Sequence, residues 1–514
     1  MDSDLRVVVV GGGPAGITAA LQARELGAQV TLLEAGHVGD STLNRGPAPV
    51  RTLARAARLA RDWSSWAEFG LAGPPPVPDL PAMIANSERV ARHAREKRDV
   101  PGYLRQQGIN LAEDLGPVRF TDPVTLTARA GNSSAGNSSA GVSRASGHAD
   151  RTWTADRIIL AVGGHAARLP IPGAELALTY EDLPGLETLP QRVAVIGGAD
   201  TGCQLASIFD DLGAAVTVYE AGAAIIPAAD ADVSAELCRA FRARDMTVAT
   251  DTIVTALSPQ HDGIRLDYRA GESAGSSVAD AVFMAVGWPA STATLDLRAA
   301  GVAVTGPAVA VDDCLRTSVP HIFAAGDVTG HGMLVQTARM EGRIAAKNAV
   351  LGTADVISYD VIPSGSFTDP EYGRVGLTEA AAAASMEVVV GIARYSELLR
   401  PVADGRTDGF CKLIADRRSH RLVGAHVLGE YSAETVQTVA ACMAAGLTVE
   451  HVAELQFAFP TFTEGVSIAA QMICRDIGIG RFPQVWSYLG AEGGKGLSSH
   501  GSDNPARRGR AQAP

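Results

Sequence analysis

The chain opens with a continuous run of apolar residues, and a similar run recurs near residue 192. Residues 6–10 read Arg-Val-Val-Val-Val, and residues 192–196 read Arg-Val-Ala-Val-Ile. A strand with one face in water would alternate apolar and polar positions, whereas an unbroken β-branched run is typical of a strand buried on both faces. The pattern therefore predicts two buried strands, one in each of two similar units.

Each run is followed by a glycine-rich turn, a helix and a second apolar strand that ends in an acidic residue. The second strands cover residues 29–33 and 215–219, and they end at Glu34 and Glu220. Such glycines allow a tight turn and a close approach of the backbone to a pyrophosphate, while the carboxylate can reach the ribose hydroxyls. Two nucleotide-binding folds are therefore predicted. The candidate residues are Gly11, Gly13, Pro14, Ala15, Gly16, Glu34 and Ala35 in the first fold, and Gly197, Ala199, Asp200, Thr201, Gly202, Glu220 and Gly287 in the second.

Two positions of the second fold bear on its nucleotide. Ala199 replaces the middle glycine, so its methyl group is expected to weaken binding of the pyrophosphate or to shift its pose. Glu220 is not followed by an arginine, and its carboxylate would bind a free 2′-hydroxyl and repel a 2′-phosphate. We therefore expect NADH to be preferred over NADPH.

Further motifs follow in a fixed order. Apolar strands leading into glycine turns occur at 158–164, 281–287 and 322–327, and a helical segment follows at 334–346. Together with the two nucleotide motifs, they resemble the flavoprotein disulphide reductases, the family of dihydrolipoamide dehydrogenase, glutathione reductase and mercuric reductase. The resemblance covers roughly residues 5 to 490 and implies FAD in the first fold and NAD in the second. The further FAD-binding residues that it implies are Ser41, Thr42, Arg51, Gly116, Ala161, Val162, Gly163, Gly326, Asp327 and Val335.

The resemblance also implies a fold class and a domain order. We expect an α/β protein with two Rossmann-like nucleotide-binding domains and a C-terminal α+β dimerisation domain that forms a two-fold homodimer. The expected parts are a first FAD-binding segment at 1–165, an NAD-binding domain at 166–288, a second FAD-binding segment at 289–356, a dimerisation domain at 357–490 and a disordered tail at 491–514.

The chain departs from this family where the family keeps its redox chemistry. The family segment reads roughly Gly-Gly-Thr-Cys-Leu-Asn-x-Gly-Cys-x-Pro-Ser-Lys, and residues 39–51 place Thr42 and Pro47 at the two cysteine positions. Near the C-terminus, Phe459 stands where the family carries the histidine that exchanges protons with the thiols. Phenylalanine cannot exchange a proton. Because the two cysteine positions and the histidine position are all changed, we expect a changed function.

Two more changes lie at positions that the family places beside the flavin. Arg51 and Gln204 stand for a lysine and a glutamate that form an ion pair there. A guanidinium without a carboxylate partner would stabilise an anionic reduced flavin and raise its potential, so both are candidate catalytic residues. Arg51 as an exposed helix residue and Gln204 as plain packing remain open alternatives.

The retained motifs favour hydride transfer from NADH through FAD directly to a non-disulphide acceptor such as a quinone. The aromatic side chains of Phe457, Phe459 and Phe462 either line a flat pocket for that acceptor or belong to the core or the dimer contact. Three alternatives stay open: a pyridine nucleotide transhydrogenase, a dehydrogenase or oxidase of a specialised metabolite, and a non-catalytic sensor that binds flavin or NADH.

The composition and charge of the chain limit the kinds of partner that it is expected to bind. The chain has 514 residues, 46% of them apolar, and a formal net charge of -12, which disfavours a nucleic-acid partner. We find no signal peptide and no apolar run of about 18 residues, so we expect a cytoplasmic protein without membrane insertion.

The six cysteines lack short spacings, which indicates neither a metal site nor a disulphide framework. A repeat of small polar residues at 131–141 is expected to be a mobile loop.

Overall fold

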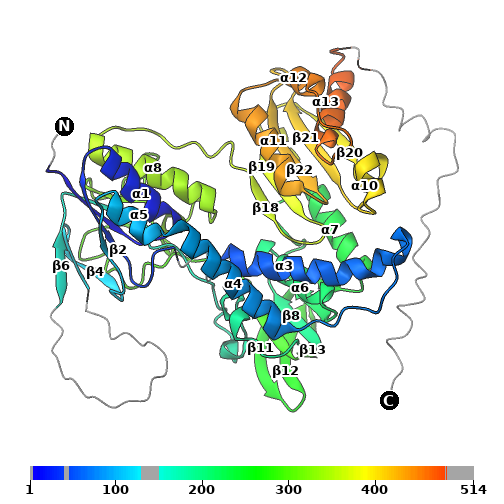
Figure 1. The fold of residues 1–514 in the computed structure, drawn as a ribbon, viewed down its shortest axis with the longest axis horizontal. Coiled ribbons are helices and arrows are strands. Elements are labelled where there is room, and N and C mark those ends of the chain that lie inside the picture. Colours follow the sequence, from blue (N-terminus) through cyan, green and yellow to red (C-terminus); the bar gives the residue numbers. More distant parts are fainter. Residues whose placement is uncertain (1–3, 40–45, 129–149, 481, 483–514) are drawn as a thin grey trace.

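The computed structural model describes residues 4–39, 46–128, 150–480 and 482 (Figure 1). The segment at 131–141 and the tail from 491 lie outside this range, as do Ser41 and Thr42. Three larger sheets organise the described residues, and we call them with their helices the first, second and C-terminal units. Among the described residues, no helix has the length and apolar character needed to cross a membrane.

The first unit is a five-stranded parallel sheet in the order β17-β7-β1-β2-β3. The predicted valine run forms β1 at its centre, where Val7 and Val9 are completely buried. Helices α1 (Pro14–Glu25) and α8 (Val335–Leu351) lie side by side on this sheet (Figure 1). Its strands are β1 (Arg6–Val10), β2 (Gln29–Leu33), β3 (Asn110–Ala112), β7 (Arg157–Leu160) and β17 (Ile322–Ala324), with an antiparallel group beside them of β4 (Val118–Asp122), β5 (Thr125–Ala128) and β6 (Arg151–Thr154).

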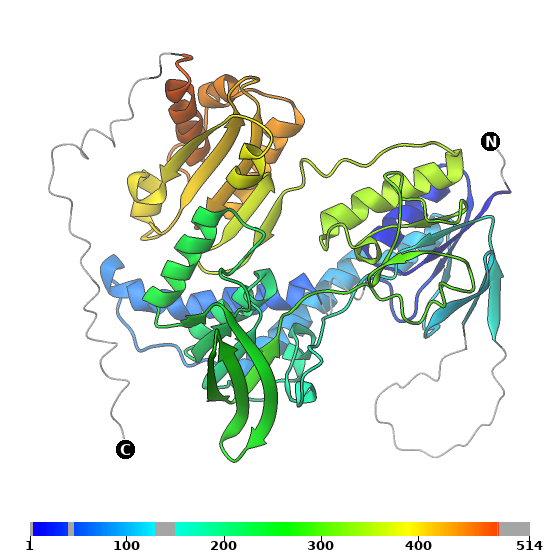
Figure 2. The same ribbon diagram turned by 180° about the vertical axis from the view of Figure 1, so that it is seen from behind.

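The second unit repeats this plan with a parallel sheet in the order β10-β9-β8-β14. An antiparallel sheet of β11, β12 and β13 projects from it, as Figure 2 shows. The elements are β8 (Arg192–Ile196), α6 (Asp200–Asp211), β9 (Ala215–Tyr219), α7 (Ala231–Ala243), β10 (Thr247–Ala249), β11 (Thr252–Gln260), β12 (Gly263–Ala270), β13 (Ser273–Ala279) and β14 (Ala281–Met284).

The C-terminal unit is an antiparallel sheet in the order β18-β19-β22-β21-β20, covered by helices. Its strands are β18 (Ser364–Ser366), β19 (Tyr372–Gly376), β20 (Val388–Arg394), β21 (Phe410–Asp416) and β22 (Leu422–Leu428). Its helices are α9 (Glu379–Ala383), α10 (Leu399–Ala403), α11 (Ser432–Ala444), α12 (Val449–Glu454) and α13 (Glu464–Asp476).

One helix joins the units. Helix α3 (Pro47–Asp62) passes between the second and C-terminal units (Figure 1). Leu53 and Ala57 are buried in one hydrophobic cluster with Phe209 of α6 and Phe410 of β21. Helix α3, which follows β2 of the first unit along the chain, therefore packs into the core that the second and C-terminal units share. Two connecting elements complete this region, α4 (Leu80–Arg98) and the 3-10 helix η3 (Tyr180–Gly185). The short helix α5 (Val100–Gln106) instead packs its Leu104 into the core of the first unit.

Candidate active site

The two predicted glycine turns have the same backbone shape. Gly11 and Gly197 have φ angles of 107° and 101°, which favour glycine. A Cβ atom on Gly16 would lie 1.8 Å from the carbonyl oxygen of Gly11, and one on Gly202 would lie 1.9 Å from that of Gly197. Both turns therefore need glycine at their first and last positions, as a dinucleotide-binding turn requires.

The strand-end carboxylates lie against these turns. Glu34 Oε2 accepts a hydrogen bond from the backbone N–H of Gly12 at 2.5 Å, and Glu220 Oε2 accepts one from Gly198 at 2.6 Å. Each carboxylate is thus fixed beside the mouth of its turn, where the ribose of a dinucleotide would offer its hydroxyls. The residues present fit FAD in the first unit and a nicotinamide nucleotide in the second.

Ala199 does not disturb the second turn. It precedes α6 with φ -80° and ψ -173°, and Gly13 precedes α1 with φ -79° and ψ -173°. This backbone is extended and accessible to any residue, so Ala199 does not strain the turn. Its methyl group can affect nucleotide binding only by direct contact with the nucleotide. Asp200 and Thr201 follow in the first turn of α6, and Asp200 adds a negative charge close to the pyrophosphate position.

The remaining FAD candidates lie around the first turn. Ala15 packs closely against Gly326, because a Cβ atom added to Gly326 would lie only 2.9 Å from the Cβ atom of Ala15. The N–H of Gly116 donates to the carbonyl of Ala35 at 3.0 Å. Pro14 begins α1, Val335 begins α8, Ala161, Val162 and Gly163 follow β7, and in the second unit Gly287 follows β14.

Asp327 has an unexpected neighbour. The indole Nε1–H of Trp288 donates to Asp327 Oδ2 at 2.9 Å, and the Trp288 ring packs on Tyr180 with centroids 5.4 Å apart. Burial raises the pKa of Asp327, and the hydrogen bond from Trp288 opposes that rise. The structure thus links Trp288, which follows β14 of the second unit, to Asp327, one of the residues that the family resemblance implies for FAD binding.

A buried glutamate near this aspartate was not expected from the sequence. Glu341 of α8 is fully buried, and its Oε2 accepts from the N–H of Gly326 at 2.6 Å. The hydroxyl of Tyr359 donates to Glu341 Oε1 at 2.7 Å and lies 2.8 Å from His331 Nδ1. Desolvation raises the pKa of Glu341. Only the unusual acidic position on the buried side of a helix could have indicated this group from sequence.

Arg51 has a partner that corrects the expectation of an unpaired guanidinium. Its NH1 lies 3.8 Å from Glu371 Oε1, and its Cζ lies 3.3 Å from the ring centroid of Phe367. Glu371 is 7% exposed on its side chain, and burial raises its pKa to about 7 despite the nearby guanidinium. Gln204 instead donates from Nε2 to the backbone oxygen of Asp200 at 3.0 Å. The residues at the two candidate catalytic positions therefore have separate partners.

The three phenylalanines do not form one pocket among the described residues. Phe462 is 3% exposed and packs edge-on against Tyr395 and Tyr431, while Phe457 lies against the same core. Phe459 is 69% exposed. Of the two alternatives left open by the sequence, the structure supports core packing for Phe462 and a surface position for Phe459.

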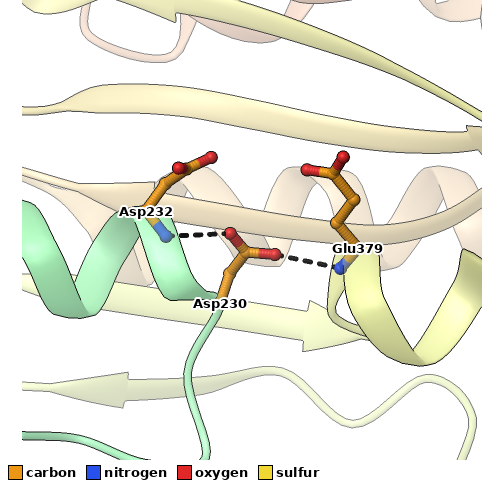
Figure 3. A group of neighbouring side chains, drawn as sticks. All are labelled: Asp230, Asp232 and Glu379. Atoms are coloured by element: carbon orange, nitrogen blue, oxygen red, sulfur yellow. Dashed lines mark hydrogen bonds between the residues drawn. The ribbon is translucent and has the colours of Figure 1, made fainter. Parts of the chain in front are cut away.

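One acidic group resembles a metal site but already holds a cation. Asp230, Asp232 and Glu379 direct their carboxylates toward a common point, which Figure 3 shows. Lys412 Nζ lies 2.7 Å from Asp230 and 2.6 Å from both Asp232 and Glu379, and Lys412 is 1% exposed. The ammonium group therefore partly neutralises this cluster and ties α7 of the second unit to the C-terminal unit.

Comparison with known proteins agrees with this geometry. Residues 5–342 match the family model described as pyridine nucleotide-disulphide oxidoreductase, and residues 362–470 match the dimerisation domain of the same family. The chain is 30% identical over 467 residues to dihydrolipoyl dehydrogenase of Zymomonas mobilis, covering 90% of this chain and 96% of the relative. It is 31% identical over 489 residues to mercuric reductase of Shigella flexneri, covering 92% and 81%.

Solved structures show the same fold. LpdA from Mycobacterium tuberculosis superposes with a TM-score of 0.80 at 24% identity, covering 91% of this chain and 99% of that protein. The HOCl-induced flavoprotein disulphide reductase RclA from Escherichia coli gives a TM-score of 0.77 at 24% identity, with 91% and 100% covered. The expected fold class is therefore confirmed, and the matched dimerisation domain supports a homodimer. The chain belongs to the pyridine nucleotide-disulphide oxidoreductase family, an oxidoreductase family that uses FAD and NAD(P)H.

Proposed function

We propose that this protein is an FAD-dependent NADH oxidoreductase that reduces a non-disulphide acceptor such as a quinone. The observation that carries the proposal is the pair of replaced cysteine positions, Thr42 and Pro47, in a chain whose cofactor turns are intact. The balanced reaction consumes NADH, a proton and the quinone, and it yields NAD⁺ and the hydroquinone. When bound, FAD supplies the site that accepts hydride from NADH and passes two electrons onward.

The six cysteines offer no obvious substitute for the missing dithiol. None is paired in the structure. Burial raises the pKa of Cys203, Cys411, Cys442 and Cys474, which keeps these thiols protonated and poorly nucleophilic. For these four cysteines, burial supports electron transfer without a sulphur relay.

The second unit supports NADH as the reductant. The Glu220 carboxylate is fixed at the turn by Gly198 and by the N–H of Gly222 at 2.7 Å. A 2′-phosphate would approach this fixed negative charge, whereas a 2′-hydroxyl could donate to it. We therefore propose NADH over NADPH.

The C-terminal unit supports a changed acceptor. Phe459 cannot exchange protons with a thiol, and Glu464 Oε2 is buried without a hydrogen-bond partner among the described residues. Desolvation raises the pKa of Glu464. This region therefore keeps a carboxyl group at Glu464 but has no proton-exchanging side chain at position 459.

The test is stopped-flow mixing of the FAD-loaded protein with NADH, followed by menadione, lipoamide or oxidised glutathione. We expect loss of the visible flavin absorbance with NADH, rapid recovery with menadione and no recovery with either disulphide. Alkylating the NADH-reduced protein with N-ethylmaleimide should change the quinone rate by less than about twofold, since no thiolate carries electrons. Rapid reoxidation by lipoamide or glutathione, or loss of turnover after alkylation, would overturn the proposal.

A further inference from the structure

A cavity of about 450 Å³ lies between α3, α4 and η3, apart from the two nucleotide turns. Leu53 of α3, Ile84 and Ala91 of α4 and Leu183 of η3 form its apolar lining. None of the residues that line it belongs to a glycine turn or a strand-end carboxylate. Its volume lies in the range of pockets that bind small organic molecules.

One face of α4 builds most of this cavity. The lining positions recur three and four residues apart, from Ile84 through Ser87 and Ala91 to Arg95, which places them on one side of a helix. Leu53, Ile84, Ala91 and Leu183 are buried, and the charged lining residues are exposed. The cavity therefore has an apolar floor and a charged rim.

Ser87 supplies an independent sign of a ligand. Its side chain is buried, with the residue 5% exposed, and its Oγ has no hydrogen-bond partner among the described residues. A helical serine commonly donates to the carbonyl four residues earlier, but this one does not. Ser87 is one of the residues that line the cavity, so its covered and unpartnered hydroxyl lies next to the space that a ligand would fill.

The rim carries unpaired positive charge. Arg92 and Arg95 line the cavity, and neither takes part in an ion pair among the described residues. Glu88 adds one carboxylate, so the three groups leave a net positive charge. Two guanidinium groups on adjacent turns suit a carboxylate, sulphonate or phosphate head group.

We propose that this cavity binds a small amphipathic anion. The head group pairs with Arg92 and Arg95, the apolar body lies against Leu53, Ala91 and Leu183, and Ser87 donates to a polar atom of the ligand. The bound molecule contacts α3 and α4, which follow the first glycine turn, and η3, which leads into β8. It therefore holds these elements together. Pro49 also lines the cavity, so the proposed site lies beside the start of α3, where Pro47 and Arg51 are found.

The test is isothermal titration calorimetry of the FAD-loaded protein with 1-anilinonaphthalene-8-sulphonate, followed by competition with octanoate and with octanol. We expect saturable binding that octanoate displaces and octanol at equal concentration does not. The double variant R92Q/R95Q should bind the sulphonate at least about tenfold more weakly, and S87A about threefold more weakly. Because S87A removes only a hydroxyl, it keeps the test valid if the double variant fails to fold.

The matched control is R89Q, since Arg89 lies on the same helix and bonds to Asn86 instead of lining the cavity. It should bind like the wild type. Equal binding by wild type, S87A and R92Q/R95Q, or equal displacement by octanol and octanoate, would overturn the proposal. Heat of binding is measured without NADH or an acceptor, so its outcome is separate from that of the proposed activity.

Discussion

At the scale of single residues, the pairing of Arg51 with Glu371 changes the meaning of the arginine. The sequence shows a retained positive charge and a lost glutamate, and it gives no sign that a carboxylate 320 positions later pairs with the arginine. That partner comes from the segment before β19, so only the folded chain brings the two together. The guanidinium is consequently neutralised in part by a group whose pKa is about 7.

This pairing predicts a pH-dependent stability. The pKa of Glu371 is raised from 4.5 to about 7 in the folded state, so the folded protein holds a proton that the unfolded chain has lost between these values. The free energy of unfolding should therefore fall as pH rises from about 4.5 to 7, by at most about 3 kcal/mol from this group. Urea denaturation at several pH values should show a flatter profile for E371Q, while E96Q, at an exposed position of α4 away from this pair, should follow the wild type. An unchanged slope in E371Q would contradict this account.

Asp200 is a second residue whose effect depends on its place in the fold. It lies in the first turn of α6, where its carboxylate interacts well with the helix dipole but opposes a pyrophosphate. The variant D200N should bind NADH about three- to tenfold more tightly, since removing one charge near the phosphates is worth about 1 kcal/mol in a solvated site. Quenching of flavin or NADH fluorescence measures this affinity. E187Q, in the loop before β8 and at the opposite end of that strand from the turn, should leave it unchanged; weaker binding by D200N would refute the argument.

At the scale of elements, the predictable parts are those specified locally. The β1 strand, its glycine turn and α1 can be predicted from residues that are adjacent in sequence. The valine run favours a buried strand, and the positive φ angle of the turn favours glycine. The position of α3 is different, because its buried leucine and alanine pack against residues that lie far away in sequence. Nothing within residues 47–62 tells which distant core the helix enters.

Lys412 shows the same limit within a strand. A lysine in a strand is ordinarily expected to be exposed, but Lys412 of β21 is buried. Its ammonium group contacts the carboxylates of Asp230, which precedes α7, of Asp232 in α7 and of Glu379 in α9. Removing the ammonium leaves these carboxylates uncompensated, so K412M should lower the free energy of unfolding by about 3–5 kcal/mol. K347M removes a half-exposed lysine that pairs with Asp355, and it should cost less than about 1 kcal/mol. Denaturant unfolding of both variants at neutral pH measures the difference; equal effects would show that burial of Lys412 adds nothing.

At the scale of the whole molecule, the exposed apolar side chains of the C-terminal unit call for a covering surface. Phe459 is 69% exposed, and Tyr431 and Leu455 are 45% and 40% exposed, all within the segment that matches the family's dimerisation domain. A second copy of the chain would remove these side chains from water. We therefore expect Phe459 to add apolar contact area at the position where the family carries its proton-exchanging histidine.

The variant F459D tests this role, because a carboxylate buried at an apolar contact between subunits would lose its hydration without gaining a partner. We expect it to shift the protein from dimer to monomer and to weaken self-association by at least about a hundredfold, which analytical ultracentrifugation across a dilution series measures. V77D introduces the same charge at a side chain that is 90% exposed and lies outside the dimerisation domain, so it should remain dimeric. If F459D associates as tightly as V77D, Phe459 lies outside the subunit contact.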